Sequence, residues 1–261
     1  MNKICIRGFY HRDNIGDDGV YKIISRELKD YSPTFSWDEF PTHERFDVTI
    51  VGGGGLSPWM TKGVVTKRLY GFSVGLVQEV SGGSILYNQM RDQVRTFDHI
   101  FVRDKLSYTV GRAITDKITL MADASMLLNP IYPKQPFNNK IGISPRYDFG
   151  DVTSYLNNLD NKIFMPFLGI DAEWAHKEFP QVNMFYDKDP EKILGALKGL
   201  KHFYCWHQLH PLVYCAMMKV PSTVTNGIAK TLAFRNMQEN YTIDEMRHMA
   251  REGMDKLLEL L

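Results

Sequence analysis

The sequence predicts an α/β protein with two Rossmann-like lobes, each built on a mainly parallel sheet. Short segments rich in β-branched residues alternate with segments whose apolar residues recur at helical spacing, a pattern typical of parallel sheets covered by helices. The pattern stops in the proline-rich stretch 129–139 and starts again at residue 140. We therefore expect a first lobe over 1–129, a linker over 130–139, a second lobe over 140–240 and a closing amphipathic helix over 241–261.

The elements of the first lobe follow from this alternation in chain order. Its strands are predicted at 3–8, 47–51, 69–74, 100–102 and 118–121. The first helix is predicted where Val20, Ile23, Ile24 and Leu28 recur at helical spacing, and further helices at 87–94 and 107–113.

The second lobe repeats the same alternation. Its strands are predicted at 140–144, 163–167, 182–186, 202–205 and 222–225. Its helices are predicted at 155–159, 171–179, 191–200 and 211–218, and Ile243 to Leu258 carry the apolar stripe of the closing helix.

Composition excludes several classes of protein. Hydrophobic residues make up 44% of the chain, which is ordinary for a globular protein, and the net charge of +1 gives no overall nucleic-acid signature. The three cysteines form no disulfide framework, which favours a reducing compartment. With no leader pattern and no apolar run long enough to cross a bilayer, we expect a cytoplasmic protein.

The glycine run Gly52, Gly53, Gly54 and Gly55 directly follows the strand predicted at 47–51. Ordering a glycine costs more backbone entropy than ordering any other residue, and glycine has no side chain that could pack. Four glycines in succession therefore indicate that a ligand approaches the backbone there. The carboxyl ends of parallel strands are the usual place for such a ligand. The alternative is a tight turn without a ligand.

Polar residues follow two other strands of the first lobe. Asn14, Gly16, Asp17 and Asp18 come after the first strand, where Asp17 or Asp18 would accept a proton from an acceptor hydroxyl. The equally good alternative is helix capping by Asn14 with acids compensating the helix dipole. Arg103 follows the strand at 100–102, where it binds an anion or forms an ion pair.

Candidate donor-binding residues follow the strands of the second lobe. Ser144 and Arg146 suit a diphosphate, and His210, just before an apolar helix, is the catalytic candidate, since the helix dipole favours a neutral ring. The alternative for His210 is a buried, structurally satisfied ring. His207 and His210 form no metal site, because no third ligand is identifiable. The remaining candidates for a phosphate are Gln208, Asn226 and Lys230. Asp171 and Glu173 either hold a sugar hydroxyl or simply occupy the first turn of a helix.

Several segments, taken together and in this order, resemble the polysaccharide pyruvyl transferase family. They are GFYHRDNIGDDG at 8–19, the glycine run at 52–55, FVRDKLS at 101–107 with Asp123 downstream, IGISPR at 141–146, and HPLVYCAMMKVP at 210–221 with Lys230 downstream. The resemblance implies a two-lobed architecture like that of GT-B glycosyltransferases. It also implies that His210 matches a histidine that, in pyruvyl transfer, would protonate the enolpyruvyl methylene.

One position departs from this family pattern. The family usually carries an arginine two residues before that histidine, whereas this chain has Gln208. Arginine offers a planar, charged fork for a phosphate or a carboxylate, and glutamine offers a neutral amide. Because phosphoenolpyruvate carries both anionic groups, Gln208 disfavours this donor.

These observations together predict a transferase that needs no cofactor. It would move a group from a small phosphate-bearing donor, bound mainly by the second lobe, to a carbohydrate hydroxyl beside the first. Glycosyl transfer from a nucleotide sugar is marginally favoured over pyruvyl transfer from phosphoenolpyruvate, and a non-catalytic binding module is the third alternative. Modified DNA is a further candidate acceptor, suggested by the basic residues Lys62, Lys67 and Arg68. The sequence leaves the oligomeric state open.

Overall fold

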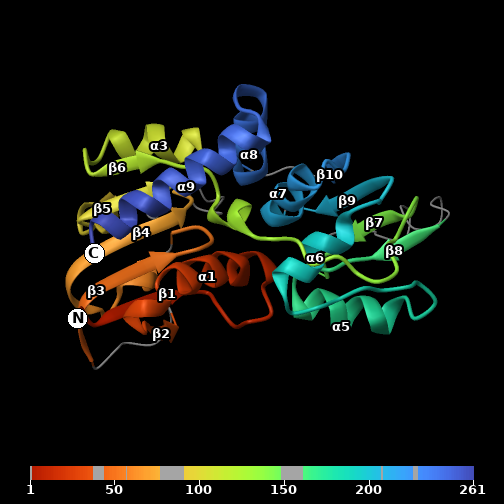
Figure 1. Ribbon diagram of the computed structural model, residues 1–261, viewed down its shortest axis with the longest axis horizontal. Coiled ribbons are helices and arrows are strands. Elements are labelled where there is room, and N and C mark those ends of the chain that lie inside the picture. The colour runs from red at the N-terminus through yellow and green to blue at the C-terminus, as the bar shows by residue number, and fades with distance from the viewer. Residues whose placement is uncertain are drawn as a thin grey trace. The chain divides into compact units, whose positions relative to one another are not determined.

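The computed structural model describes residues 2–37, 44–56, 58–76, 91–147, 161–206, 208–225 and 229–261 (Figure 1). The chain forms two compact units. The first comprises Met1–Tyr10, Val20–Leu127 and Leu232–Leu261, and the second comprises His11–Gly19 and Leu128–Thr231. Residues 11–19 and 128–129 of the predicted first lobe group with the second unit, and residues 232–240 of the predicted second lobe group with the first.

The first unit is built on a sheet with the strand order β2-β1-β3-β4-β5-β6, in which every neighbouring pair is parallel. Its strands are β1 (Ile4–Gly8), β2 (Thr34–Trp37), β3 (Arg45–Gly52), β4 (Val65–Val74), β5 (His99–Val102) and β6 (Ile118–Leu120). The helices and short 3-10 helices between or directly after these strands are α1 (Ile15–Glu27), η1 (Lys29–Tyr31), η2 (Pro58–Thr61), α3 (Lys105–Arg112) and η3 (Ala124–Leu127). The final helices are α8 (Ala229–Asn240) and α9 (Ile243–Glu259).

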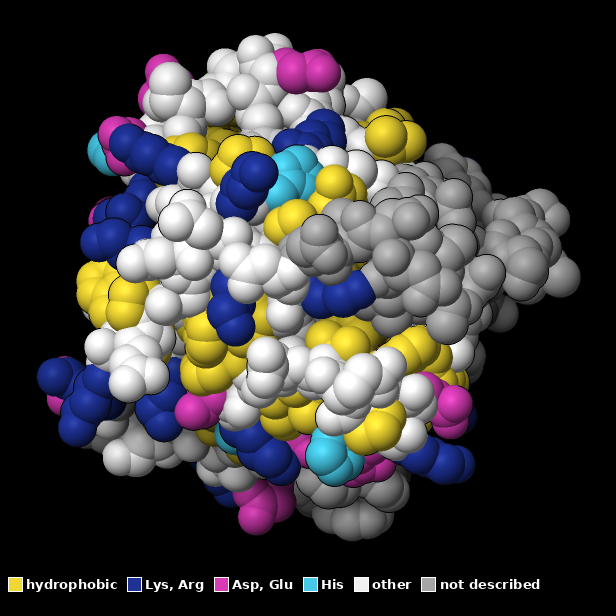
Figure 2. Space-filling view, turned by 90° about the vertical axis from the view of Figure 1, so that its right-hand side faces the viewer, with side chains coloured by type: hydrophobic (Ala, Val, Ile, Leu, Met, Phe, Trp, Pro, Cys, Tyr) yellow, Lys and Arg dark blue, Asp and Glu magenta, His cyan; other side chains and the backbone are white. Residues whose placement is uncertain are grey.

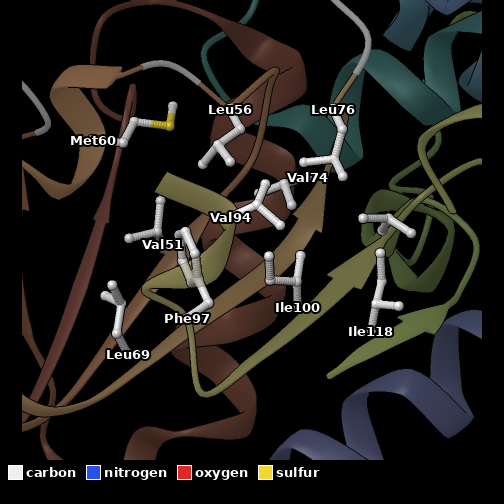
Figure 3. Close-up of a cluster of buried hydrophobic side chains, with 11 residues drawn as sticks. Val51, Leu56, Met60, Leu69, Val74, Leu76, Val94, Phe97, Ile100 and Ile118 are labelled. Atoms are coloured by element: carbon white, nitrogen blue, oxygen red, sulfur yellow. The ribbon is translucent and has the colours of Figure 1, made fainter. Parts of the chain in front are cut away.

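A cluster of buried apolar side chains packs against this sheet (Figure 3). Its side chains come from β3, β4, β5 and β6 and from the segments that join them, and each is at least nine-tenths buried. Burying one aliphatic or aromatic side chain of this size contributes about 1.5–3 kcal/mol, so the cluster is a main source of stability for the first unit. The members are Val51, Leu56, Met60, Leu69, Val74, Leu76, Val94, Phe97, Ile100, Val102 and Ile118.

Helix α9 is capped at its start and is held on the first unit by two arginines. Its first turn has a capping box, in which Thr242 and Glu245 each bond the other's backbone amide. Arg251 makes two hydrogen bonds of 3.1 and 3.2 Å to the Glu27 carboxylate of α1. Near the C-terminal end of α9, Arg68 of β4 donates to the carbonyls of Leu260 and Leu261 at 2.6 and 2.9 Å. A cation is stabilising there because the C-terminal end of a helix carries a partial negative charge.

The second unit has a smaller, all-parallel sheet with the order β10-β9-β7-β8. Its strands are β7 (Ile141–Ser144), β8 (Lys162–Phe164), β9 (His202–Trp206) and β10 (Ser222–Thr225), and its helices are α5 (Gly169–Glu178), α6 (Pro190–Leu197) and α7 (Leu209–Met217). Ala175 of α5 packs with Ile143, Phe164 and Trp206 in the core of this unit. The predicted fold class of two α/β units on parallel sheets is confirmed.

Most of the predicted elements are found, with one strand wrong and two elements missed. In place of the strand predicted at 182–186, Met184 forms an isolated parallel bridge to Phe164 of β8. The Phe164 amide donates to the carbonyl of Asn183, and the Phe185 amide donates to the carbonyl of Phe164, both at 2.8 Å. The amide of Val182 instead donates to the carbonyl of Phe179, so this end of the predicted strand is a turn. Strand β2 and helix α8 were not predicted. Residues 87–90 of one predicted helix, and all of the helix predicted at 155–159, lie outside the described residues.

Two further features concern the helices and the cysteines. No helix within the described part of the chain is both long and apolar enough to span a membrane. Cys5, Cys205 and Cys215 are all buried as free thiols.

Candidate functional site

A chain of buried hydrogen bonds joins three elements at the carboxyl edge of the second sheet. Ser144, the last residue of β7, donates its hydroxyl to Oε1 of Gln208 at 2.5 Å. The amide nitrogen of Gln208 donates to Oδ2 of Asp171 in α5 at 3.2 Å, and Oδ1 of Asp171 accepts the backbone amide of Tyr147 at 3.2 Å. The three side chains are each more than nine-tenths buried, so the network is a rigid part of the fold.

This network leaves two helix N-termini without side-chain caps. Gln208 is the N-cap residue of α7, but its side chain makes no capping hydrogen bond. Its amide is held by Ser144 and Asp171 instead. Helix α5 begins after Leu168, an apolar residue that cannot cap. Because Gln208 and Asp171 are hydrogen-bonded, the first turns of α5 and α7 lie close together. The amide of Gly169, the first residue of α5, already donates to the carbonyl of Asp13 at 2.9 Å.

His210 lies in the first turn of α7 and is 9% exposed. Its imidazole packs directly on the backbone of Gly16, so that a Cβ atom at position 16 would overlap the ring. The structure therefore brings His210 together with the loop after the first strand, although the two are far apart in the sequence. Both belong to the second unit.

Backbone hydrogen bonds join the loop before α1 to the segment between β8 and α5 of the same unit. The amide of Ile15 donates to the carbonyl of Phe167 at 3.0 Å, and the amide of Gly169 donates to the carbonyl of Asp13 at 2.9 Å. His11 and Asp13 have φ angles of 56° and 54°, in the left-handed region that is uncommon for non-glycine residues but that His and Asp adopt more often than most.

The polar residues of this loop have separate partners. Asn14 donates to Oδ2 of Asp17 at 2.7 Å, and its own Oδ1 lies 3.5 Å from the Asp17 amide in the capping position. Asp17 is 5% exposed. Oδ1 of Asp18 accepts the amide of His11 at 2.6 Å. Burial raises the pKa of Asp18 above its usual range, in spite of that hydrogen bond.

The glycine run belongs to the first unit, where Gly52 ends β3 and the next three glycines bend alongside the end of β4. A Cβ atom on Gly52 would lie 2.6 Å from the hydroxyl of Tyr10, and Gly53 and Gly54 have φ angles of 73° and 66°. The carbonyl of Gly54 accepts the amide of Gly75 at 3.0 Å, and the bridge between Gly55 and Gly75 continues the pairing. Close packing and left-handed backbone thus account for three of the four glycines.

Arg103 also belongs to the first unit. Its Nη1 lies 3.3 Å from Oδ2 of Asp123, and both side chains are at least 95% buried. The other oxygen of Asp123 accepts the hydroxyl and the amide of Ser125 at 2.6 and 3.0 Å. This geometry is that of a buried ion pair joining the ends of β5 and β6.

The remaining candidates are only partly described. Arg146 is half-buried and follows Ser144 and Pro145, and Lys230 is half-buried in the first turn of α8. His207 and Asn226 lie outside the described residues. Within the described ranges, no group of three or more His, Cys, Asp or Glu side chains could hold a metal ion. Sequence analysis did not single out Tyr147, whose only signal is an aromatic residue directly after the strand-end motif IGISPR.

Comparison with known proteins supplies a family and a fold. The family model described as polysaccharide pyruvyl transferase matches residues 8–226. None of the curated proteins matches the chain. Among solved structures, the UDP-GlcNAc 2-epimerase of Methanocaldococcus jannaschii, in complex with UDP-GlcNAc and UDP, is similar with a TM-score of 0.58 and 12% identity, over 85% of this chain and 83% of that one. S. aureus MnaA, solved with UDP, has a TM-score of 0.56 and 10% identity, over 96% of this chain and 91% of that one. At these identities the likeness shows the fold, and the predicted GT-B-like architecture is confirmed.

Proposed function

Because the chain belongs to the polysaccharide pyruvyl transferase family and is therefore a transferase, we propose that it moves a group from a phosphate-bearing donor to a carbohydrate hydroxyl. The observation that carries this proposal is the pair of uncapped helix N-termini, α5 and α7, beside the buried network of Ser144, Gln208 and Asp171. Backbone amides at such a place bind phosphate oxygens without needing a side chain.

The donor phosphates would be bound by the first turns of these helices and by two cations. Arg146 follows the end of β7 and carries a planar guanidinium that suits two phosphate oxygens. Lys230 lies in the first turn of α8, within the second unit, and would add a second positive charge. In this arrangement Gln208 and Ser144 position the helix ends and do not contact the donor directly.

The reacting groups would be His210 and one of the two carboxylates, Asp17 or Asp18. Each already accepts a hydrogen bond, Asp17 from Asn14 and Asp18 from the His11 amide, so either could use its second oxygen to take the proton from the acceptor hydroxyl. In glycosyl transfer the hydroxyl oxygen bonds the anomeric carbon, and the bond to the donor phosphate breaks with its electrons on the phosphate. His210 would donate an N–H to the leaving phosphate, stabilising the negative charge as it develops.

Nucleotide sugars are favoured over phosphoenolpyruvate as the donor. Recognising phosphoenolpyruvate needs a cation for its carboxylate as well as for its phosphate. At position 208 this chain has a neutral amide that is already engaged by Ser144 and Asp171. UDP and UDP-GlcNAc in the structures of similar fold agree with a nucleotide donor.

Pyruvyl transfer from phosphoenolpyruvate is the second candidate, and the family model favours it. In that reaction His210 would protonate the enolpyruvyl methylene while one acceptor oxygen bonds the neighbouring carbon. A second acceptor oxygen would then bond the same carbon as the phosphate leaves with the electrons of its bond. Arg146 or Lys230 would then have to bind the carboxylate.

A carbohydrate hydroxyl is favoured as the acceptor over modified DNA. Two of the three basic residues that suggested DNA are engaged within the protein. Lys67 forms an ion pair with Asp47 at 2.6 Å, and Arg68 bonds the carbonyls of Leu260 and Leu261. We also infer a reducing, cytoplasmic location, which the three buried free thiols support.

The experiment that tests this function compares donors on one sugar acceptor. The purified protein is incubated with the acceptor and with either a set of nucleotide sugars or phosphoenolpyruvate, and the product mass is measured. Gain of a glycosyl group supports our first choice, and gain of a pyruvyl group replaces it with the second. If no donor raises the melting temperature and no product forms, the chain is a binding module and not a transferase.

A further inference from the structure

Tyr147 is an exposed aromatic side chain at the proposed donor site. It is 49% exposed, whereas most large apolar side chains of the protein are buried. It directly follows Arg146, and its amide is held by Asp171 at 3.2 Å. The residue therefore lies where the buried network ends at the surface.

The backbone of Tyr147 is anchored, but its ring has no partner within the described part of the chain. No hydrogen bond of its hydroxyl and no ring contact occurs there. Ile170, next to Asp171 in the chain, is 52% exposed, so a second apolar side chain lies one residue from the same hydrogen bond. Figure 2 views the side on which β7, β8 and β10 lie in Figure 1, and hydrophobic side chains are exposed there between lysines and arginines.

An anchored, exposed aromatic ring next to a cation suits a ligand with two matching parts. The flat ring can stack on a planar group, and the adjacent guanidinium can bind an anion joined to that group. Nucleotides combine a planar base with phosphates. Phosphoenolpyruvate and inorganic phosphates have the anion but no ring.

We propose that Tyr147 is the stacking platform for the base of a nucleoside diphosphate donor whose phosphates reach Arg146. This inference rests on the proposed function, because it assumes that the phosphates bind at the first turns of α5 and α7. It deepens that function by assigning the residue that binds the base of the nucleotide donor.

Calorimetric titration of the complete chain with pyrophosphate and with UDP, CDP, ADP and GDP tests the proposal. We expect at least one nucleotide to bind about tenfold or more tightly than pyrophosphate, as one base–aromatic stack provides. Tyr147→Ala should abolish this preference and leave pyrophosphate binding unchanged, and Tyr147→Phe should keep it. The matched control is Tyr132→Ala, because Tyr132 is 53% exposed in the same unit but its ring lies 4.5 Å from Nζ of Lys198. The Tyr132→Ala variant should still bind the nucleotide more tightly than pyrophosphate.

The outcomes separate this inference from the proposed function. If pyrophosphate binds but no nucleotide binds more tightly, the stacking platform is wrong and the phosphate site remains. A nucleotide preference that survives Tyr147→Ala likewise overturns the assignment. If neither pyrophosphate nor any nucleotide binds, the phosphate site and the platform are both wrong. Equal melting temperatures for the variants and the parent protein exclude misfolding as the cause of lost binding.

Discussion

The contact between Gly16 and His210 predicts a large functional effect from adding a single methyl group. An alanine Cβ at position 16 would overlap the imidazole of His210, so Gly16→Ala must displace the ring or the helix. Replacing a helical glycine by alanine normally stabilises by up to about 1 kcal/mol. Overpacking a filled site costs about 1–3 kcal/mol. We therefore expect a net loss of about 0–3 kcal/mol in the free energy of unfolding.

The effect on turnover should be much larger than the effect on stability. If His210 donates to the leaving phosphate, moving its ring should lower turnover about a hundredfold or more. Transferase assays and urea unfolding on the same preparation measure both quantities. A folded Gly16→Ala variant with normal turnover would refute the proposed role of this contact.

A double-mutant cycle separates the contact from other effects of the alanine. In the His210→Ala background the ring is absent, so Gly16→Ala should no longer destabilise and should stabilise by up to about 1 kcal/mol. The coupling free energy should then be about 1–3 kcal/mol, in the range of residues in direct contact. Equal effects of Gly16→Ala in both backgrounds would mean that the two residues do not touch.

Further predictions concern the histidines, the glycine run and pH. His210→Ala should lower turnover about a hundredfold while weakening donor binding less, and His207→Ala should have the smaller effect; the reverse order in a kinetic assay would reassign the catalytic histidine. Gly54→Val should lower the melting temperature, because its φ of 66° disfavours valine; activity retained in the folded variant would show that the glycine run binds no ligand. Burial raises the pKa of Asp18, so the stability that this group contributes is fully present below its ordinary pKa and is lost as pH rises through the raised value. Asp18→Asn keeps an oxygen for the His11 amide and should remove this pH-dependent loss, which unfolding curves across acidic pH would detect; an unchanged pH dependence would contradict the assignment.

The sequence predicted the internal strands and the edge strands β6, β8 and β10, and it missed the edge strand β2. The internal strand β3 contains four successive β-branched residues at 48–51, and the internal strand β9 contains the apolar residues 203–206. Strand β2, with the sequence TFSW, lies at a sheet edge and has only a few residues of mixed polarity. The alternation Val182, Met184, Tyr186 imitates a strand, but the turn after α5 uses the first of these residues.

The sequence also identified which residues lie at strand ends, but it did not show how they pair. Ser144, Gln208 and Asp171 were separate candidates, and only the fold shows that they form one buried network. The contact of Gly16 with His210 depends on how a loop after the first strand is bound by the chain after β8, which no local pattern encodes. Arg103 had two interpretations from sequence, and its ion pair with Asp123 depends on the neighbouring strand.

The discontinuous composition of the second unit limits how the protein can be dissected. Residues 11–19 are part of that unit, although Val20–Leu127 of the first unit separate them from its remainder, Leu128–Thr231. A recombinant fragment of residues 128–231 would therefore lack the strand-like partner of Phe167 and Gly169, and the backbone against which the His210 ring rests. A truncation to one continuous stretch of sequence therefore cuts through the unit. A variant in which a short linker replaces residues 20–127 would keep both of its segments.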